Sequence, residues 1–288
     1  MKINDTKASL PERHQIKARD INFNYVEWKG DDPQILMLHG DMRTSRSFDA
    51  VSRELNEKYN IFAMDARGHG DSDWPETGYS IDDRVEDLAS FCKATKIINA
   101  VGIGHSLGGG VMSLCNDRYE GIFQKLILLE PDFVFDKDFY NRALSRVNRQ
   151  HRSWKNHGHL EGYLKQHKIA SRWREDVIED VVVHETQELH DGSIAMKWSM
   201  NTFGLDNGVT NCYDLRPDFR ETSTPILFIL SEDNRQYYSD LSDIALEKAG
   251  IDSIVISGAG HNMYMEKPDI VAKVIDSYLT DDSLPNFV

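Results

Sequence analysis

The chain contains 288 residues, with 47 acidic residues against 33 lysines and arginines, so its formal net charge is −14. Hydrophobic residues make up 40% and charged residues 28%, which is ordinary for a globular protein with a well-populated core. The length fits one large domain or one domain with an insertion. The negative balance argues against a general binder of nucleic acids or anionic membranes, because phosphate groups repel such a surface.

The three cysteines, Cys92, Cys115 and Cys212, are odd in number and far apart, so their spacing indicates neither a zinc site nor a disulfide framework. Reduced thiols are typical of a cytoplasmic protein, which is the location that we expect. Residues 1–28 carry charges throughout and contain no apolar run of signal-peptide length. No segment approaches 18 consecutive apolar residues, so we expect no membrane span.

The pattern of apolar residues predicts alternating strands and helices. Residues 1–18 are polar and charged, which predicts a loose N-terminal arm, and residues 21–28 resemble one strand of an antiparallel hairpin. Short unbroken apolar runs then alternate with segments of helical spacing, as in strands buried on both faces. The predicted strands are 35–38, 61–64, 97–103, 126–129, 226–230 and 253–257, and the predicted helices are 47–59, 81–92, 107–119 and 269–278.

The helix that begins near residue 81 has the clearest start signal. Ser80 is a typical N-cap residue, and Asp83 follows three positions later as in a weak capping box. Such an alternation of helices and buried strands predicts an α/β fold, with a mostly parallel central β-sheet and helices on both faces.

A long gap separates the two halves of the predicted sheet. Residues 132–218 lack clear buried strands, look helical, and contain three of the five tryptophans. We interpret them as a helical cap inserted over the sheet, because strand patterns stand on both sides of them. The core domain is then predicted to comprise residues 19–131 and 219–288.

The first half of this gap is strongly basic. Lys137–Arg174 contains ten lysines and arginines and two acidic residues, a local net charge of +8. One interpretation is a solvated helix face, and the other is a rim that attracts an anionic substrate or an acidic patch of a partner. Its histidines have no metal-ligand spacing and no acidic neighbours, so we expect no metal there; they are His151, His157, His159 and His167.

The most informative motif lies between a predicted strand and a predicted helix. Gly104-x-Ser106-x-Gly108 matches the nucleophile-elbow pattern, in which a sharp turn presents a serine hydroxyl at the carboxyl edge of a sheet. Small residues two positions before and after the serine allow the neighbouring backbone to approach. A dinucleotide-binding loop would need a glycine where this chain has Leu107.

Two further segments follow predicted strands and therefore reach the same edge. His39-Gly40-Asp41 would face the serine, and the N–H groups of Asp41 and Leu107, beside Gly40, would form an oxyanion hole. His261 follows strand 253–257 and would act as general base toward Ser106 and then as general acid toward the leaving group.

The segments LHG, DARGHGDS, GHSLGG and GAGH…EKP together resemble those of the α/β-hydrolase fold family, over about residues 20–280. The resemblance implies a hydrolase that needs no metal or organic cofactor, with the inserted residues as its variable cap. A serine at the elbow argues against the family's epoxide hydrolases and dehalogenases, which carry an aspartate there. Arg67 and His69, in the segment DARGHGDS, are expected to form a packed, hydrogen-bonded corner.

The resemblance leaves two candidates for the acid that supports His261. The family usually places an aspartate in a Gly-x-x-Asp turn after the strand that follows the cap, but this chain reads Ser231-Glu232-Asp233-Asn234. Asp233 stands one residue early in that turn. Glu130 ends strand 126–129, where a subset of the family carries its acid. We favour Glu130 over Asp233, because the turn departs from the family's pattern.

The sequence thus predicts cleavage of a carboxylic ester of a small molecule through an acyl-enzyme on Ser106. The alternatives are a C–C bond hydrolase or lactonase with the same triad, and a non-catalytic receptor for a small molecule. We expect a monomer or homodimer that binds neither nucleic acid nor membrane. The expected pocket residues are His39, His105, Trp154 and Trp173, with Phe203 as a further aromatic candidate.

Overall fold

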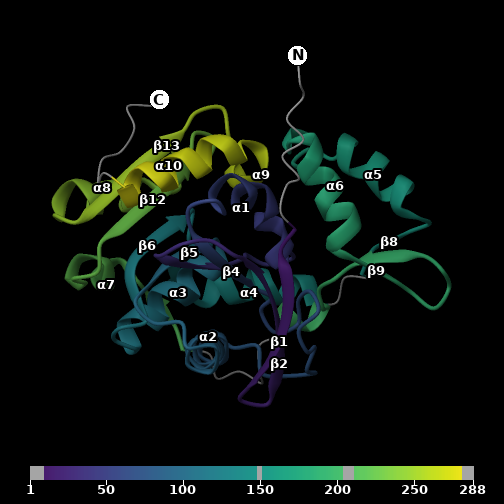
Figure 1. The fold of residues 1–288 in the computed structure, drawn as a ribbon, viewed down its shortest axis with the longest axis horizontal. Helices are drawn as coiled ribbons and strands as arrows, with labels where there is room; N and C mark the ends of the chain where they lie inside the picture. The colour runs from purple at the N-terminus through teal and green to yellow at the C-terminus, as the bar shows by residue number, and fades with distance from the viewer. Residues whose placement is uncertain (1–9, 148–150, 204–210, 281–288) are drawn as a thin grey trace.

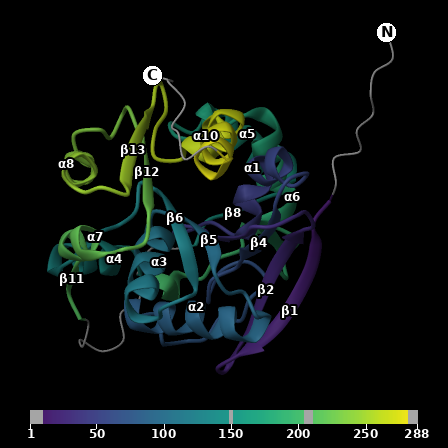
Figure 2. The ribbon, with the colours of Figure 1, turned by 60° about the vertical axis from the view of Figure 1, so that its left-hand side comes forward.

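The computed structural model describes residues 10–147, 151–203 and 211–280. Its central sheet has eight strands in the order β1-β2-β4-β3-β5-β6-β12-β13, and all of them except β3 are labelled from right to left in Figure 2. β1 and β2 pair antiparallel, as do β2 and β4, and all other neighbours are parallel, which confirms the predicted sheet. The strands are β1 (Glu12–Ala18), β2 (Ile21–Trp28), β3 (Gln34–Leu38), β4 (Asn60–Met64), β5 (Ala100–His105), β6 (Phe123–Leu129), β12 (Ile226–Ser231) and β13 (Ile251–Ile256).

The N-terminal segment differs from the predicted loose arm. Residues 1–9 lie outside the described residues, but Glu12–Ala18 forms the edge strand β1, which pairs with β2 along its whole length. A polar sequence can form an edge strand because the pairing satisfies its backbone while most of its side chains face water. Composition alone therefore did not reveal it.

The interior strands are apolar on both faces because helices cover both. Ile35 and Met37 of β3 pack on one side in the same cluster as residues of α1 (Asp49–Leu55) and α10 (Pro268–Thr280). Leu36 and Leu38 pack on the other side with α2 (Ile81–Thr95), α3 (Leu107–Arg118) and α8 (Ser239–Glu247). In Figure 2, α1 and α10 lie above the strands and α2 and α3 below them. This layering brings the loops after the parallel strands to one edge of the sheet.

Residues 132–218, called the insertion below, contain more strand than the helical pattern predicted. Three short strands form a separate antiparallel sheet in the order β8-β10-β9, and β7 pairs with β11. Strands of two or three residues are too short to leave a periodic pattern in the sequence. The elements are β7 (Val134–Phe135), α4 (Lys137–Val147), β8 (Ser153–Trp154), α5 (His157–Gln166), α6 (Glu175–His184), β9 (Thr186–Glu188), β10 (Ile194–Met196), β11 (Tyr213–Asp214) and α7 (Arg216–Glu221), the last of which continues past residue 218.

The outer part of the insertion lies beside the core domain. Figure 1 shows α5, α6, β8 and β9 together on one side of the central sheet. Arg53 of α1 joins the two parts by donating to Asp176 at 3.0 Å and to Asp180 at 2.6 Å, both on α6. The backbone N–H of Arg174 also donates to the carbonyl of Met265, in α9 (Met263–Glu266), at 3.0 Å. These contacts tie the insertion to the edge that carries the loops.

None of the helices within the described residues has the length and apolar character needed to cross a bilayer. The three cysteines carry free thiols: Cys92 and Cys115 are buried, whereas Cys212 is exposed.

The start of α2 yields a prediction about stability. The Ser80 hydroxyl accepts from the N–H of Asp83 at 3.1 Å and donates to its carboxylate at 2.6 Å. Ser80→Ala leaves that N–H without its cap, so we expect the free energy of unfolding to fall by about 1 kcal/mol in urea melts. Ser90→Ala, inside the same helix, is the control. An equal effect of both substitutions would contradict the capping role.

Candidate active site

Ser106 lies at the sharp turn between β5 and α3. Its backbone has φ 51° and ψ −123°, a region that serine rarely adopts. A Cβ on Gly104 would stand 2.5 Å from the Cα of Gly109, and one on Gly108 would overlap the carbonyl oxygen of Leu38. The glycines before and after Ser106 are therefore required by close backbone packing, as the elbow pattern predicts.

The ends of neighbouring strands place Ser106 and Glu130 at the same edge. The N–H of Ser106 donates to the carbonyl of Leu129 at 3.0 Å, and the N–H of Glu130 donates to that of Ile229 at 3.0 Å. The ladder of parallel strands thus continues one residue beyond β5 and β6. Glu130 also has a positive φ, 40°, so both residues leave their strands in a strained conformation.

Glu130 is fully buried and contacts His261. Its Oε2 lies 2.7 Å from His261 Nδ1 and 2.9 Å from Nδ2 of Asn234, which donates to it. Its Oε1 accepts from the Ser231 N–H at 2.8 Å and from the Ser231 hydroxyl. Burial alone would raise the pKa of Glu130, but the hydrogen bonds from His261, Ser231 and Asn234 outweigh it, and the net shift is downward. The site therefore favours an ionised carboxylate.

Asp233, the other candidate acid, lies elsewhere. Its carboxylate is half-exposed and forms an ion pair with Arg172 of the insertion. The structure thus brings Glu130, and not Asp233, to His261. The departure of residues 231–234 from the family's turn has a physical reason, because Ser231 and Asn234 are both donors to Glu130.

Ser106 and His261 line one cavity of about 560 Å³. Within the described part of the chain, the Ser106 hydroxyl donates only to Asp132 Oδ2, at 3.4 Å, and forms no hydrogen bond with His261. Hydrogen bonds between a nucleophile and its base often tighten only when substrate is bound. His105 contacts His261 in two ways. Its Nε2 donates to the His261 carbonyl at 2.9 Å, and the centres of the two rings are 4.6 Å apart.

The segment predicted to form the oxyanion hole lies against Ser106. A Cβ on Gly40 would stand 3.0 Å from the Cβ of Ser106, and Asp41 lines the same cavity. Leu107 is the first residue of α3, where backbone N–H groups have no acceptor within the helix. The geometry therefore brings both predicted donor residues next to the serine.

The predicted pocket residues divide into two groups. His105, Trp154 and Trp173 line the cavity. Contrary to the prediction, His39 lies beside a separate cavity of about 20 Å³, where its Nδ1 donates to the Gly40 carbonyl and its Nε2 accepts from a backbone N–H. Burial lowers the pKa of His39 to about 4, so its ring is neutral and structural. Phe203 does not line the cavity either; it is buried against Trp198, which does.

The corner predicted at residues 65–72 is confirmed. Arg67 is buried and paired with Asp87, to which its Nη2 donates at 2.6 Å. His69 is buried too, and its Nδ1 donates to the carbonyl of Arg67 at 3.0 Å.

Several cavity residues were not singled out from the sequence. Asp132, two residues after Glu130, is the carboxylate beside Ser106, and its place just past a strand end could have drawn attention to it. Burial and the nearby Asp41 raise the pKa of Asp132 to about 6, although His261 opposes this shift. The arginines that line the cavity are Arg43, Arg142, Arg146 and Arg152, and the last three belong to the basic stretch noted above.

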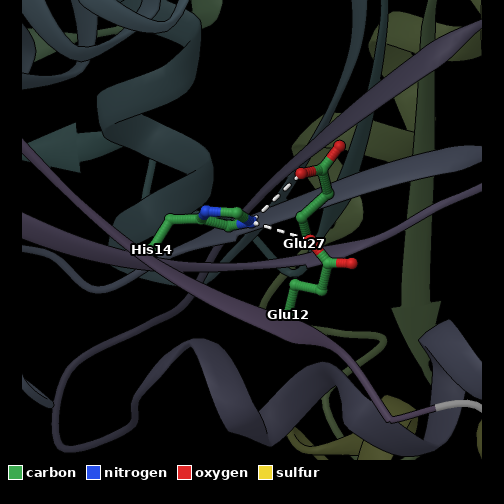
Figure 3. Close-up of side chains that lie close together, drawn as sticks. All are labelled: Glu12, His14 and Glu27. Carbon is green, nitrogen blue, oxygen red and sulfur yellow. Dashed lines mark ion pairs between the residues drawn. The ribbon is translucent and has the colours of Figure 1, made fainter.

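Two clusters of possible metal ligands occur among the described residues, and neither includes a cavity residue. Figure 3 shows the first, where His14 Nε2 lies 3.2 Å from Glu27 and 3.7 Å from Glu12 across the β1–β2 pair. Lys29 already pairs with Glu12 at 2.7 Å. In the second cluster, formed by Asp49, Asp180 and His184, arginines pair with both carboxylates. The carboxylates of Glu12, Asp49 and Asp180 thus already have cationic partners in the protein.

The raised pKa of Asp132 yields a prediction about stability and pH. Its folded-state pKa of about 6 exceeds the ordinary value of 3.8, so the stability that it contributes is complete below pH 4 and lost as the pH rises through 6. Asp132→Asn should therefore raise the free energy of unfolding by about 1 to 2 kcal/mol more at pH 7.5 than at pH 4. Urea melts at both values test this, with the exposed Asp117→Asn as control. A difference that does not depend on pH would contradict it.

Comparison with known proteins is consistent with this geometry. A curated relative, 2-(acetamidomethylene)succinate hydrolase of Mesorhizobium japonicum, is 25% identical over 96% of this chain and 99% of its own length. A crystal structure of E-2-(acetamidomethylene)succinate hydrolase superposes with a TM-score of 0.81 at 23% identity, covering 95% of this chain and 100% of that one. The thioesterase domain from the curacin biosynthetic pathway gives 0.77 at 17% identity, with 93% and 100% covered. Residues 35–274 match the alpha/beta hydrolase family, and the chain belongs to that family.

Proposed function

We propose that this protein is a serine hydrolase that cleaves a carboxylic ester of a small molecule through an acyl-enzyme on Ser106. The contact between the buried Glu130 carboxylate and His261 Nδ1, at 2.7 Å, carries this proposal. It fixes the imidazole so that Nε2 is available to a nucleophile, and Ser106 lines the same cavity. In such a set the carboxylate orients the histidine and stabilises its positive charge, and the histidine acts as general base toward the serine.

In the proposed reaction, the Ser106 hydroxyl turns from Asp132 to His261. His261 Nε2 takes the hydroxyl proton while Oγ forms a bond to the ester carbonyl carbon. The N–H groups of Leu107 and Asp41 would hold the oxyanion of the tetrahedral intermediate. Glu130 stabilises the imidazolium, which then protonates the leaving alcohol.

The acyl-enzyme is then hydrolysed by the same groups. His261 takes a proton from a water molecule, whose oxygen attacks the acyl carbon, and then returns the proton to Ser106 Oγ as the acid product leaves. No metal or organic cofactor enters this sequence. The insertion acts as a cap in the proposal, because Trp154 and Trp173 supply apolar wall to the cavity above the nucleophile.

Cleavage of a bond other than an ester by the same serine is a second candidate. The name of the Mesorhizobium relative describes a substrate with an acetamido group and without an ester. A panel of activated esters, lactones, N-acyl enamines and β-diketones separates these reactions by their relative kcat/KM. The non-enzymatic alternative is a receptor that binds a small molecule in this cavity without converting it.

The first prediction from this mechanism concerns the nucleophile. Ser106→Ala should lower kcat for a p-nitrophenyl short-chain ester by about 10³- to 10⁶-fold, because no other group can form the acyl-enzyme. A fluorophosphonate probe should label the wild type at Ser106 and leave the variant unlabelled. Ser113→Ala, on the same helix α3, is the control.

Two outcomes would reject the proposal. Wild-type activity in Ser106→Ala would show that another group is the nucleophile. Tight binding of small molecules by the wild type, without turnover or labelling, would support the receptor.

The second prediction distinguishes the two acids. Glu130→Gln keeps the volume but removes the charge that stabilises the imidazolium, so kcat should fall by about 10²- to 10⁴-fold. Asp233→Asn removes an exposed partner of Arg172 and should change kcat by less than about threefold. Parallel steady-state kinetics test both variants. A larger loss in Asp233→Asn than in Glu130→Gln would assign the acid to Asp233.

A further inference from the structure

The polar lining of the large cavity contains charged side chains of both signs. Asp41 and Asp132 stand beside Ser106, at the edge of the central sheet. Burial raises the pKa of both carboxyl groups, but the value of about 6 for Asp132 leaves it ionised at neutral pH. The helix α4 and the loop before β8, both in the insertion, contribute basic residues to the same lining. These residues, called the arginine triplet below, are Arg142, Arg146 and Arg152.

The arginine triplet is unusual because the described part of the chain offers none of its members a carboxylate partner. Neighbouring arginines of the insertion are paired: Arg172 binds Asp233 and Glu266, and Arg174 binds Asp176. Arg43, which also lines the cavity, lies 3.7 Å from Glu185. The triplet therefore brings positive charge to the cavity with no direct ion pair among the described residues, although Arg142 and Arg146 are near enough to Asp132 and Asp41 to oppose the rise in the pKa of those carboxyls.

Aromatic rings hold two of these guanidinium groups in place. The guanidinium of Arg152 lies 4.1 Å from the centre of the Tyr163 ring and 5.7 Å from that of Trp154, and both rings line the cavity. The guanidinium of Arg146 lies 5.4 Å from the Phe203 ring. Stacking uses the flat face of a guanidinium and leaves its N–H edge available for a carboxylate, which it can bind through two parallel hydrogen bonds.

We propose that the arginine triplet binds a carboxylate of the substrate. This inference rests on the proposed function, since it names the substrate class of the same cavity. The ionised Asp132 repels an anion from the neighbourhood of Ser106, while the triplet attracts it. The two charges together orient the substrate, with its uncharged acyl carbon toward Ser106. A cavity of about 560 Å³ accommodates a small carboxylic acid of this kind.

Matched substrates of different charge test this proposal. One pair places the carboxylate in the alcohol part: 4-acetoxybenzoate and its neutral analogue 4-acetoxybenzamide. The other places it in the acyl part: p-nitrophenyl hydrogen adipate and its methyl ester. In at least one pair we expect kcat/KM to be about ten- to a hundredfold higher for the anion, mainly through KM. The preference should shrink as salt is added.

Variants of the triplet identify the residues responsible. R142Q/R146Q/R152Q should bring the anionic-to-neutral ratio of kcat/KM close to one, and R142K/R146K/R152K should retain most of the preference. Arg220→Gln, on exposed α7, is the matched control and should change nothing. Thermal melting of each variant shows whether it is folded.

A binding measurement keeps the test independent of turnover. Adipate should raise the Tm of the wild type and of Ser106→Ala more than adipamide does, and this difference should vanish in R142Q/R146Q/R152Q. Equal treatment of anionic and neutral compounds by the wild type, in both kinetics and melting, would overturn the inference. If the wild type still hydrolysed neutral esters and Ser106→Ala did not, the proposed function would hold although the inference had failed.

Discussion

The buried carboxylate of Glu130 is the constraint on which the arrangement at the sheet edge depends. An ionised carboxylate removed from water is costly unless donors replace its hydration. Four donor groups do so here, from His261, Asn234 and both the backbone and the hydroxyl of Ser231. Because these donors come from the ends of different strands, the carboxylate couples β6, β12 and the loop after β13 into one rigid unit.

The two parts of the chain contribute different properties to the cavity. The core domain supplies groups whose positions need to be exact, since Ser106 and Glu130 sit at strand ends with strained backbones. The insertion supplies aromatic walls and the arginine triplet, on helices, short strands and loops that lie outside the central sheet. A rigid centre with a separate wall allows the chemistry to stay constant while the preferred substrate changes.

Much of the fold was predictable because buried strands and helices leave strong periodic signals. The strands on both sides of the insertion, the cap at Ser80 and the elbow at Ser106 were all recognised in this way. β1 was missed because an edge strand can be polar, and β8, β9 and β10 were missed because they are too short to show a period. His39 was wrongly predicted to line the pocket, because a histidine after a strand can point either to the cavity or to the corner formed by residues 65–72.

The sequence by itself determined the order of elements, the mostly parallel sheet and the residues that reach its carboxyl edge, since these follow from local patterns and from chain connectivity. It could not choose between Glu130 and Asp233, because both stand after strands at suitable distances along the chain. Only the tertiary structure decided which of them meets His261, as side-chain contacts across three strands depend on how those strands are packed. The same holds for the arginine triplet, because only the packed structure shows that its members form no ion pair with a carboxylate in the described part of the chain.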